Sequence, residues 1–150
     1  MEKLIADNKK SYFDYYIEDK FTAGIVLEGQ EVKSIRAGRV NLRDSYVLVK
    51  DGEVWLMGAH ISKYEKADGL KKIDERRTRK LLLNKSEINK LTKAVKVKGY
   101  TIVPTKMTMV DNFIKVEIAI AKGKELHNKK DALKEKDIKR EADRELKNYK

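Results

Sequence analysis

The sequence predicts a mainly β fold with a charged C-terminal tail, and three features of its pattern indicate this. Short apolar runs separated by turn residues extend from Tyr12 to Ile120. Asp51-Gly52 lies between two such runs, and this dipeptide is typical of a tight β-hairpin. Residues 122–150 are rich in charge and poor in apolar side chains. Together these features favour a small closed OB-like barrel of about six strands, with two or three short helices and a charged C-terminal tail. A two-sheet sandwich is the alternative.

The expected strands are short runs of aromatic and β-branched residues that end at turn residues. A second hairpin is predicted at Asp111-Asn112. After it, apolar residues alternate with Lys115, Glu117 and Ala119, which indicates a strand with one buried face. Pro104 is expected to mark an edge or a bulge. The expected strand segments are Tyr12–Ile17, Phe21–Leu27, Tyr46–Val49, Val54–Met57, Tyr100–Thr105, Lys106–Val110 and Phe113–Ala121.

Two helices are expected between the strands. The first covers Gln30–Ala37 and ends at Gly38, which suits the left-handed position after a helix. The second covers Ser86–Lys96, with Ser86 as the N-cap and Glu87 in the first turn. Its apolar face consists of Ile88, Leu91 and Val95.

The C-terminal segment differs in character from the rest of the chain. Residues 122–150 contain 11 Lys or Arg and 7 Asp or Glu. A thin stripe of Ile138, Ala142 and Leu146 is too small to hold the segment folded alone. We expect residues 1–122 to form the barrel and residues 123–150 to be disordered alone and helical, over about 35 Å, against a partner. A permanent solvated helix is the alternative.

The balance of charges points to a polyanionic partner. Lys and Arg number 35 against 24 Asp and Glu, so the formal net charge is +11. Such an excess attracts nucleic acid because phosphate contacts release counterions, although it also serves solubility alone. Cysteine is absent, and His60 and His127 are too few and too far apart in sequence for a zinc site. No apolar run approaches a membrane span or a signal peptide, so a cytoplasmic protein is expected.

Two basic clusters are candidates for RNA contact. The denser one ends in Arg76, Arg77, Arg79 and Lys80, and arginine suits phosphate and base stacking better than lysine. A solvated loop balanced by neighbouring acids is the alternative. The second cluster is Asn8, Lys9 and Lys10, followed by aromatic residues that stack on bases in some OB surfaces or else fill the core. These aromatic residues are Tyr12, Phe13, Tyr15, Tyr16 and Phe21.

Catalytic motifs are missing from the sequence. It contains no cysteine nucleophile, no glycine-rich phosphate loop and no HExxH motif. Glu31 could act as a general base, but nothing nearby in sequence completes a site, and a salt-bridged acid on a helix surface is the commoner explanation. An enzyme is therefore not predicted.

Ordered blocks along almost the whole chain resemble the SsrA-binding protein (SmpB) family. The most informative is Ala23–Gly38, in which an apolar run between two glycines leads into a helix that carries Glu31 and Lys33. Similarity extends from Asn8-Lys9-Lys10 to Lys139-Arg140-Glu141. The other matching blocks are Asp44–Tyr46, Gly58–Ile61, Arg77–Leu83, Glu87-Ile88, Lys98–Pro104 and Lys115–Lys124.

The resemblance implies an OB-fold barrel that binds the tRNA-like domain of transfer-messenger RNA at its elbow. It implies a tail that occupies the decoding centre and the empty mRNA channel of a stalled ribosome. Alanyl-tRNA synthetase and elongation factor Tu would act on the same RNA, and the protein itself would need no cofactor or metal. Glu31, Lys33 and Arg36 then join the RNA-binding candidates, with Glu31 shaping or polarising the binding face. The implied ribosome-binding tail residues are Lys124, His127, Lys129, Lys130, Lys134, Lys136, Lys139 and Arg140.

The chain departs from the family pattern at a few positions. Ile73 and Glu75 replace the histidine and proline of an Asn-His-Asp-Pro motif, Lys63 replaces a proline, and Asn128 replaces an aspartate. The alternative to the family's function is a general single-strand nucleic-acid-binding OB protein. A nuclease or RNA-modifying enzyme with a basic surface is a third hypothesis, from another class.

Overall fold

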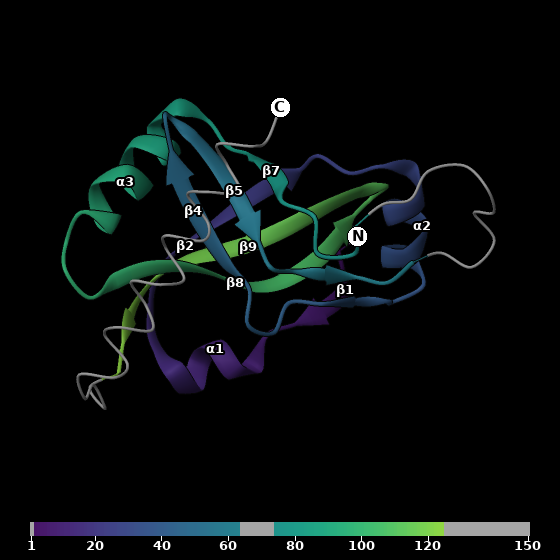
Figure 1. Ribbon diagram of the computed structural model, residues 1–150, viewed down its shortest axis with the longest axis horizontal. Coiled ribbons are helices and arrows are strands. Elements are labelled where there is room, and N and C mark those ends of the chain that lie inside the picture. Colours follow the sequence, from purple (N-terminus) through teal and green to yellow (C-terminus); the bar gives the residue numbers. More distant parts are fainter. Residues whose placement is uncertain (1, 64–73, 125–150) are drawn as a thin grey trace.

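A computed structural model describes residues 2–63 and 74–124 (Figure 1). Within these residues, three helices interrupt a series of antiparallel strands. The mainly β prediction is therefore confirmed. In chain order the elements are β1 (Glu2–Asp7), α1 (Lys9–Asp14), β2 (Tyr15–Ile25), α2 (Gly29–Arg36), β3 (Val40–Asn41), β4 (Tyr46–Lys50), β5 (Glu53–Met57), β6 (His60–Ile61), β7 (Arg79–Leu82), α3 (Lys85–Val95), β8 (Tyr100–Val110) and β9 (Phe113–Gly123).

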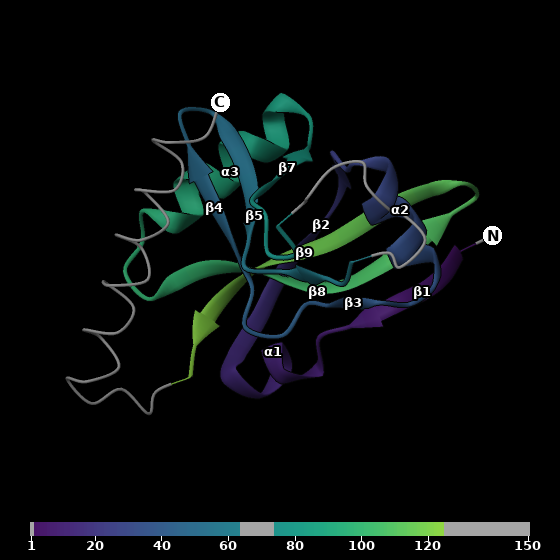
Figure 2. The same cartoon turned by 45° about the vertical axis from the view of Figure 1, so that its right-hand side comes forward.

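The paired strands form a ring. Each strand pairs with the next in the order β8, β4, β5, β7, β2 and β9, and β9 pairs in turn with β8. Strand β1, which the sequence analysis did not foresee, pairs with the later part of β8, from Lys106 to Val110, and β3 pairs with β6 in a separate two-stranded sheet. Helices α1 and α3 lie on opposite sides of the long β8–β9 pair, and α2 lies toward one end of it (Figures 1 and 2).

The β8–β9 hairpin is the longest paired unit in the fold. The two runs expected before Asp111 form one strand, with a shift of register between Pro104 and Lys106. This bulge confirms the prediction for Pro104, because a proline has no N–H to give the ladder. On β9 the apolar face is buried as expected, but Ala119 and Ala121 on the opposite face are buried as well. Both faces of this part of β9 are therefore covered.

Both predicted hairpin turns form where the sequence placed them. Asp51 and Gly52 have φ values of 54° and 75°, which are left-handed conformations that Asp and Gly accept more readily than other residues. Asp111 adopts a φ of 56° in the second hairpin. These turns fix the registers of β4 with β5 and of β8 with β9.

The prediction of a strand over Tyr12–Ile17 is wrong. Its first three residues end α1, and the rest begins β2, which continues to Ile25 through a bulge between Ile17 and Lys20. Asn8 fixes the start of α1, because its backbone N–H donates to Thr105 and its side-chain amide donates to Pro104. Aromatic β propensity is weaker than this tertiary anchoring.

The two other helices lie close to their expected positions. Helix α2 ends before Gly38, whose φ of 78° confirms its role as the residue after the helix. Helix α3 begins one residue earlier than expected, and Asn84, not Ser86, is its N-cap. The Asn84 Oδ1 accepts from the Glu87 N–H at 2.9 Å, while the Glu87 carboxylate accepts from the Asn84 N–H at 3.2 Å. This capping box places Leu91 fully in the core.

The hydrophobic core lies inside the ring of strands and under α2 and α3. Its buried side chains come from nearly every strand of the ring and from both helices, so the ring and helices depend on one another. The largest members of this core include Ile35, Leu42, Leu56, Ile61, Leu81, Leu91, Ile102, Met107 and Ile118.

Candidate functional site

Glu31 lies at the centre of a buried ionic cluster. Its side chain enters from α2 and contacts two arginines, Arg77 just before β7 and Arg79 at the start of β7. Oε1 accepts from Arg77 Nη2 at 2.5 Å, and Oε2 accepts from Arg79 Nε at 2.7 Å. Glu31 is 3% exposed and Arg79 is 0% exposed, so this pair is shielded from solvent. The expectation of a surface salt bridge for Glu31 is therefore wrong.

The same carboxylate also caps its own helix. Glu31 occupies the third position of α2, and its Oε1 accepts from the Glu28 N–H at 2.9 Å. That N–H belongs to the helix end, where no backbone acceptor is available. One side chain thus starts α2 and holds the segment before β7 against it.

Arg79 connects this cluster to two loops. Its Nη1 donates to the Ala59 carbonyl at 2.8 Å, and its Nη2 donates to the Glu75 carbonyl at 3.0 Å. Arg76 Nη1 donates to the Gly58 carbonyl at 3.0 Å. The guanidinium fork of Arg79 therefore joins the backbone just before β6 to the backbone of the segment between β6 and β7.

The electrostatics of the cluster favour its ionised form. Burial by itself raises the pKa of Glu31, but hydrogen bonds from Arg77 and the Glu28 N–H, together with the charge of Arg79, outweigh it and lower the pKa below its ordinary value. Burial lowers the pKa of the Arg79 guanidinium, against the opposing effect of Glu31. The acid and the arginine hold each other charged inside the protein.

Exposed cations lie on the same segments as the members of this cluster. Lys33 and Arg36 lie exposed on α2, and Arg76 is exposed in the segment before β7. Lys80 is half-buried and donates to Glu53 at 3.2 Å. Through Glu31, the structure joins α2, which carries Lys33 and Arg36, to the part of the chain that carries Arg76 and Arg77.

The candidates of the N-terminal cluster lie elsewhere, on α1 (Figures 1 and 2). Lys9 is exposed, and Lys10 is exposed and pairs with Asp44 at 3.0 Å. Asn8 is 6% exposed and anchors α1 to β8. Neither Asn8 nor Arg79 offers a surface for direct RNA contact, so we replace that expectation for both with a positioning role.

Lys124 is the last described residue of the chain. Its N–H donates to the Asp14 carbonyl at 3.1 Å, and its Nζ donates to the Tyr12 carbonyl at 3.0 Å. The expectations for the rest of the tail lie outside the described residues, as do those for Ile73. The tail candidates concerned are His127, Lys129, Lys130, Lys134, Lys136, Lys139 and Arg140.

The chain matches a known protein family over most of its length. The family model described as "SmpB protein" matches residues 5–148. The chain belongs to the SmpB family. Proteins named SsrA-binding protein from Coxiella burnetii (strain Dugway 5J108-111) and Thermoanaerobacter pseudethanolicus are 53% and 52% identical to it. The first alignment covers 99% of this chain and 93% of the relative, and the second covers 97% and 92%.

A solved structure shows the same fold. A chain from the structure "tmRNA-SmpB: a journey to the center of the bacterial ribosome" is 40% identical to this SmpB family member, with a TM-score of 0.68. The match covers 82% of this chain and 86% of that chain.

At one position where the chain departs from the SmpB family pattern, the side chain makes a contact within the fold. Glu75, which replaces a proline, places its Oε2 2.6 Å from His60 Nε2. Its carbonyl also accepts from the Ile61 N–H at 2.9 Å. The sequence analysis missed this contact, since neither residue carries a local signal for it. In this SmpB family member, a side-chain contact between His60 and Glu75 therefore adds to the attachment of the β6–β7 segment.

Two further classes of site are not supported within the described part of this SmpB family member. Residues 2–63 and 74–124 contain no group of three or more His, Cys, Asp or Glu side chains arranged to hold a metal ion. Among the same residues, no helix has both the length and the apolar character needed to cross a membrane.

Proposed function

We propose that this chain binds the tRNA-like domain of transfer-messenger RNA and brings it to stalled ribosomes for trans-translation. Its relatives are SsrA-binding proteins, and its structural neighbour belongs to a tmRNA–SmpB structure. The observation in this chain that carries the proposal is the buried Glu31 cluster, which fixes exposed cations from α2 and from the segment before β7 on one support.

The RNA-binding face in this proposal consists of Lys33, Arg36, Arg76 and Arg77. Arginine and lysine side chains bind phosphate through charge and hydrogen bonds, and a rigid support lowers the entropy lost on binding. Glu31 and Arg79 are buried and hold these residues in place. The ring of strands serves as an OB-like barrel that carries this face.

The tail has a separate role in the proposal. Residues 123–150 occupy the decoding centre and the empty mRNA channel, where alternating charges suit a path lined by phosphate and protein. Alanyl-tRNA synthetase and elongation factor Tu act on the same RNA, and the chain acts in the cytoplasm without catalysing a reaction of its own.

The first experiment measures binding of the isolated tRNA-like domain across a series of salt concentrations. With about 4–6 phosphate contacts, log K should fall against log salt with a slope of about −3 to −5. Unlabelled single strands of equal length serve as competitors. Displacement by these strands as efficient as by the tRNA-like domain would favour a general single-strand binder instead. Release of labelled RNA fragments would indicate a nuclease.

A second experiment tests delivery to the ribosome. A reconstituted translation system programmed with an mRNA that lacks a stop codon should tag stalled chains only when transfer-messenger RNA and this protein are both present. Tagging that proceeds at the same rate without the protein would contradict the proposal.

A further inference from the structure

A cavity of about 570 Å³ opens on the side of the fold that carries α1. Its walls come from α1, the start of β4, the start of β8 and the end of β9. This volume is in the range of small-molecule sites. The exposed cations Lys33, Arg36 and Arg76 do not line it. The cavity is therefore separate from the face described above.

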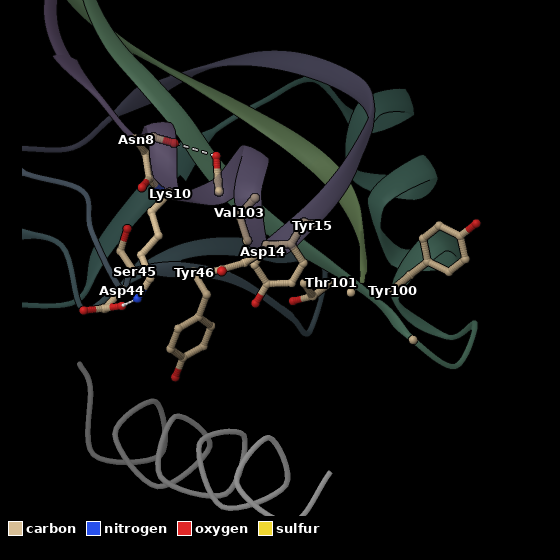
Figure 3. A pocket seen from close by; sticks show the side chains of 13 residues that line it. Asn8, Lys10, Asp14, Tyr15, Asp44, Ser45, Tyr46, Tyr100, Thr101 and Val103 are labelled. Carbon is tan, nitrogen blue, oxygen red and sulfur yellow. Dashed lines mark hydrogen bonds and ion pairs between the residues drawn. The ribbon is translucent and has the colours of Figure 1, made fainter. Parts of the chain in front are cut away.

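Aromatic and acidic side chains share this cavity. Figure 3 shows Asp14, Tyr15 and Tyr46 turned toward the same space, while the Tyr100 ring points away from the other labelled side chains. Two tyrosine rings offer apolar surface on which a flat ring can stack, as bases do in single-strand binding sites. The walls thus suit a planar ligand better than a bulky aliphatic one.

The two carboxylates in the cavity differ in their surroundings. Asp44 pairs with Lys10 Nζ at 3.0 Å, and the Lys10 hydrogen bond lowers the pKa of Asp44. None of the ion pairs among the described residues involves Asp14, which is exposed at the end of α1. Asp14 is therefore the carboxylate that a ligand can reach, and it disfavours a phosphate inside the cavity.

Lys10 is the cation that lines the cavity, and it is paired with Asp44, while further cations neighbour the lining residues in the sequence. Lys9 precedes Lys10 on α1, and Lys122 and Lys124 flank the lining residue Gly123. Lys124 Nζ lies 5.3 Å from the centre of the Tyr16 ring, so its charge stays on the α1 side. With Lys10 paired to Asp44, the carboxylate of Asp14 in the cavity and the neighbouring lysines match a nucleotide whose base enters the cavity and whose phosphates remain outside.

We propose that this cavity binds an unpaired guanine of an RNA strand. The guanine edge carries two adjacent donors, N1–H and N2–H, and the two oxygens of Asp14 can accept both. Adenine and cytosine place a ring-nitrogen acceptor beside their amino group, and a carboxylate repels that acceptor. The ring stacks on tyrosine, and the neighbouring phosphates meet Lys9, Lys122 and Lys124. The inference shares with the proposed function only that the ligand is RNA.

Fluorescence anisotropy with the full chain tests this assignment. The probes are three labelled RNA strands with five uridines on each side of a central guanosine, inosine or adenosine. The guanosine strand should bind about tenfold more tightly than the adenosine strand. Inosine lacks the N2 amino group and should bind with intermediate affinity. Guanosine monophosphate alone should compete weakly, because it lacks the flanking phosphates.

Asp14→Asn is the decisive variant, because it changes one accepting oxygen into a donor at an exposed position. It should remove most of the guanosine preference. Asp51→Asn is the matched control, since it removes the same charge at a hairpin turn where asparagine fits well, and it should keep the preference. The NMR signals of the Tyr15 and Tyr46 rings should shift with the guanosine strand in the wild-type chain and in Asp51→Asn.

Three outcomes would overturn the inference. They are equal binding of the three strands, a guanosine preference that survives Asp14→Asn, and ring signals that respond to N-acetyl-arginine amide but not to the guanosine strand. The last would identify the ligand as a cationic side chain. Binding of the tRNA-like domain is measured separately, so a chain that holds this domain without preferring guanosine contradicts only this inference.

Discussion

At the scale of single residues, one carboxylate has two structural tasks. Glu31 caps α2 through the Glu28 N–H and neutralises Arg77 and Arg79. A buried ion pair costs much of its attraction in lost hydration, so it is weak evidence for net stability. Loss of one partner is different, because the remaining charge stays buried. If the Glu31 carboxylate were lost, Arg79 would keep a buried charge without its ionic partner.

Glu31→Gln should therefore destabilise the fold by about 3–5 kcal/mol. Glutamine keeps the shape and one accepting oxygen but not the charge that Arg79 requires. Urea unfolding at neutral pH measures the difference. Glu53→Gln is the matched control, because it removes the charge of a solvent-exposed pair with Lys80. An equal loss of stability in both variants would show that burial of the Glu31 cluster has no special role.

The pH dependence of stability gives a second test of Glu31. The folded pKa of this group is lower than its ordinary 4.5, so the folded state binds fewer protons than the unfolded state. The contribution to stability is complete above pH 4.5 and is lost as the pH falls through the folded pKa. Between pH 5 and 3, the free energy of unfolding should fall more steeply in the wild-type chain than in Glu31→Gln. Parallel curves would contradict this.

Surface and buried arginines near Glu31 should behave differently on substitution. Arg76→Ala should leave the melting temperature nearly unchanged and weaken binding of the tRNA-like domain, with the salt slope reduced by about 0.7–0.9 for each phosphate that is no longer neutralised. Arg79→Lys keeps the charge but loses the fork that binds Glu31, Ala59 and Glu75, so it should lower the melting temperature. Lys90→Ala on α3 controls for the loss of one exposed charge. Unchanged stability in Arg79→Lys would show that the fork is dispensable.

At the scale of elements, helix starts and hairpin turns organise the ring. The starts of α2 and α3 satisfy backbone groups at the helix end through side chains of the same helix. Helix α3 is the clearest example, because its capping box joins Asn84 and Glu87 and its single buried residue, Leu91, reaches the core. The strength of the cap should therefore be measurable on its own.

Asn84→Ala should destabilise the fold by about 1 kcal/mol, because the Glu87 N–H loses its acceptor. Ser86→Ala should cost less, since the Ser86 hydroxyl only donates to the Asn84 side chain. Urea unfolding compares the two variants, and neither should change affinity for the tRNA-like domain. A larger loss of stability in Ser86→Ala than in Asn84→Ala would indicate that Ser86 is the N-cap.

At the scale of the whole molecule, the described fold ends where the proposed ribosome-binding tail begins. Strand β9 continues to Gly123, one residue beyond the boundary predicted at 122, and Lys124 still donates to Asp14 and Tyr12. A cut after Lys124 therefore keeps every backbone pairing of β9. The two proposed tasks, RNA binding and ribosome engagement, can be separated at this point.

A chain that ends at Lys124 should stay folded and bind the tRNA-like domain with nearly unchanged affinity. It should fail to tag stalled chains, because the segment proposed for the mRNA channel is gone. Thermal unfolding, domain binding and the reconstituted tagging reaction measure the three properties. Full tagging by the shortened chain would contradict the tail proposal, and loss of domain binding would place the tail in the RNA-binding face.

The sequence by itself determined the local structures of this protein. The turns at Asp51-Gly52 and Asp111, the end of α2 at Gly38, the bulge near Pro104 and the positions of two helices all follow from a few neighbouring residues. Backbone preferences and hydrophobic periodicity act over such short distances. Composition indicated a polyanionic partner, and the ordered motifs indicated the family that the comparison then confirmed.

Only the tertiary structure decided which residues meet. Glu31 reaches Arg77 and Arg79 across 46 and 48 positions of sequence, and no local pattern encodes that pairing. The same holds for α1, where anchoring of Asn8 to Thr105 and Pro104 overrides aromatic strand propensity. Burial is a property of the assembled core, so it alone shows that Arg79 supports the surface while Arg76 forms it.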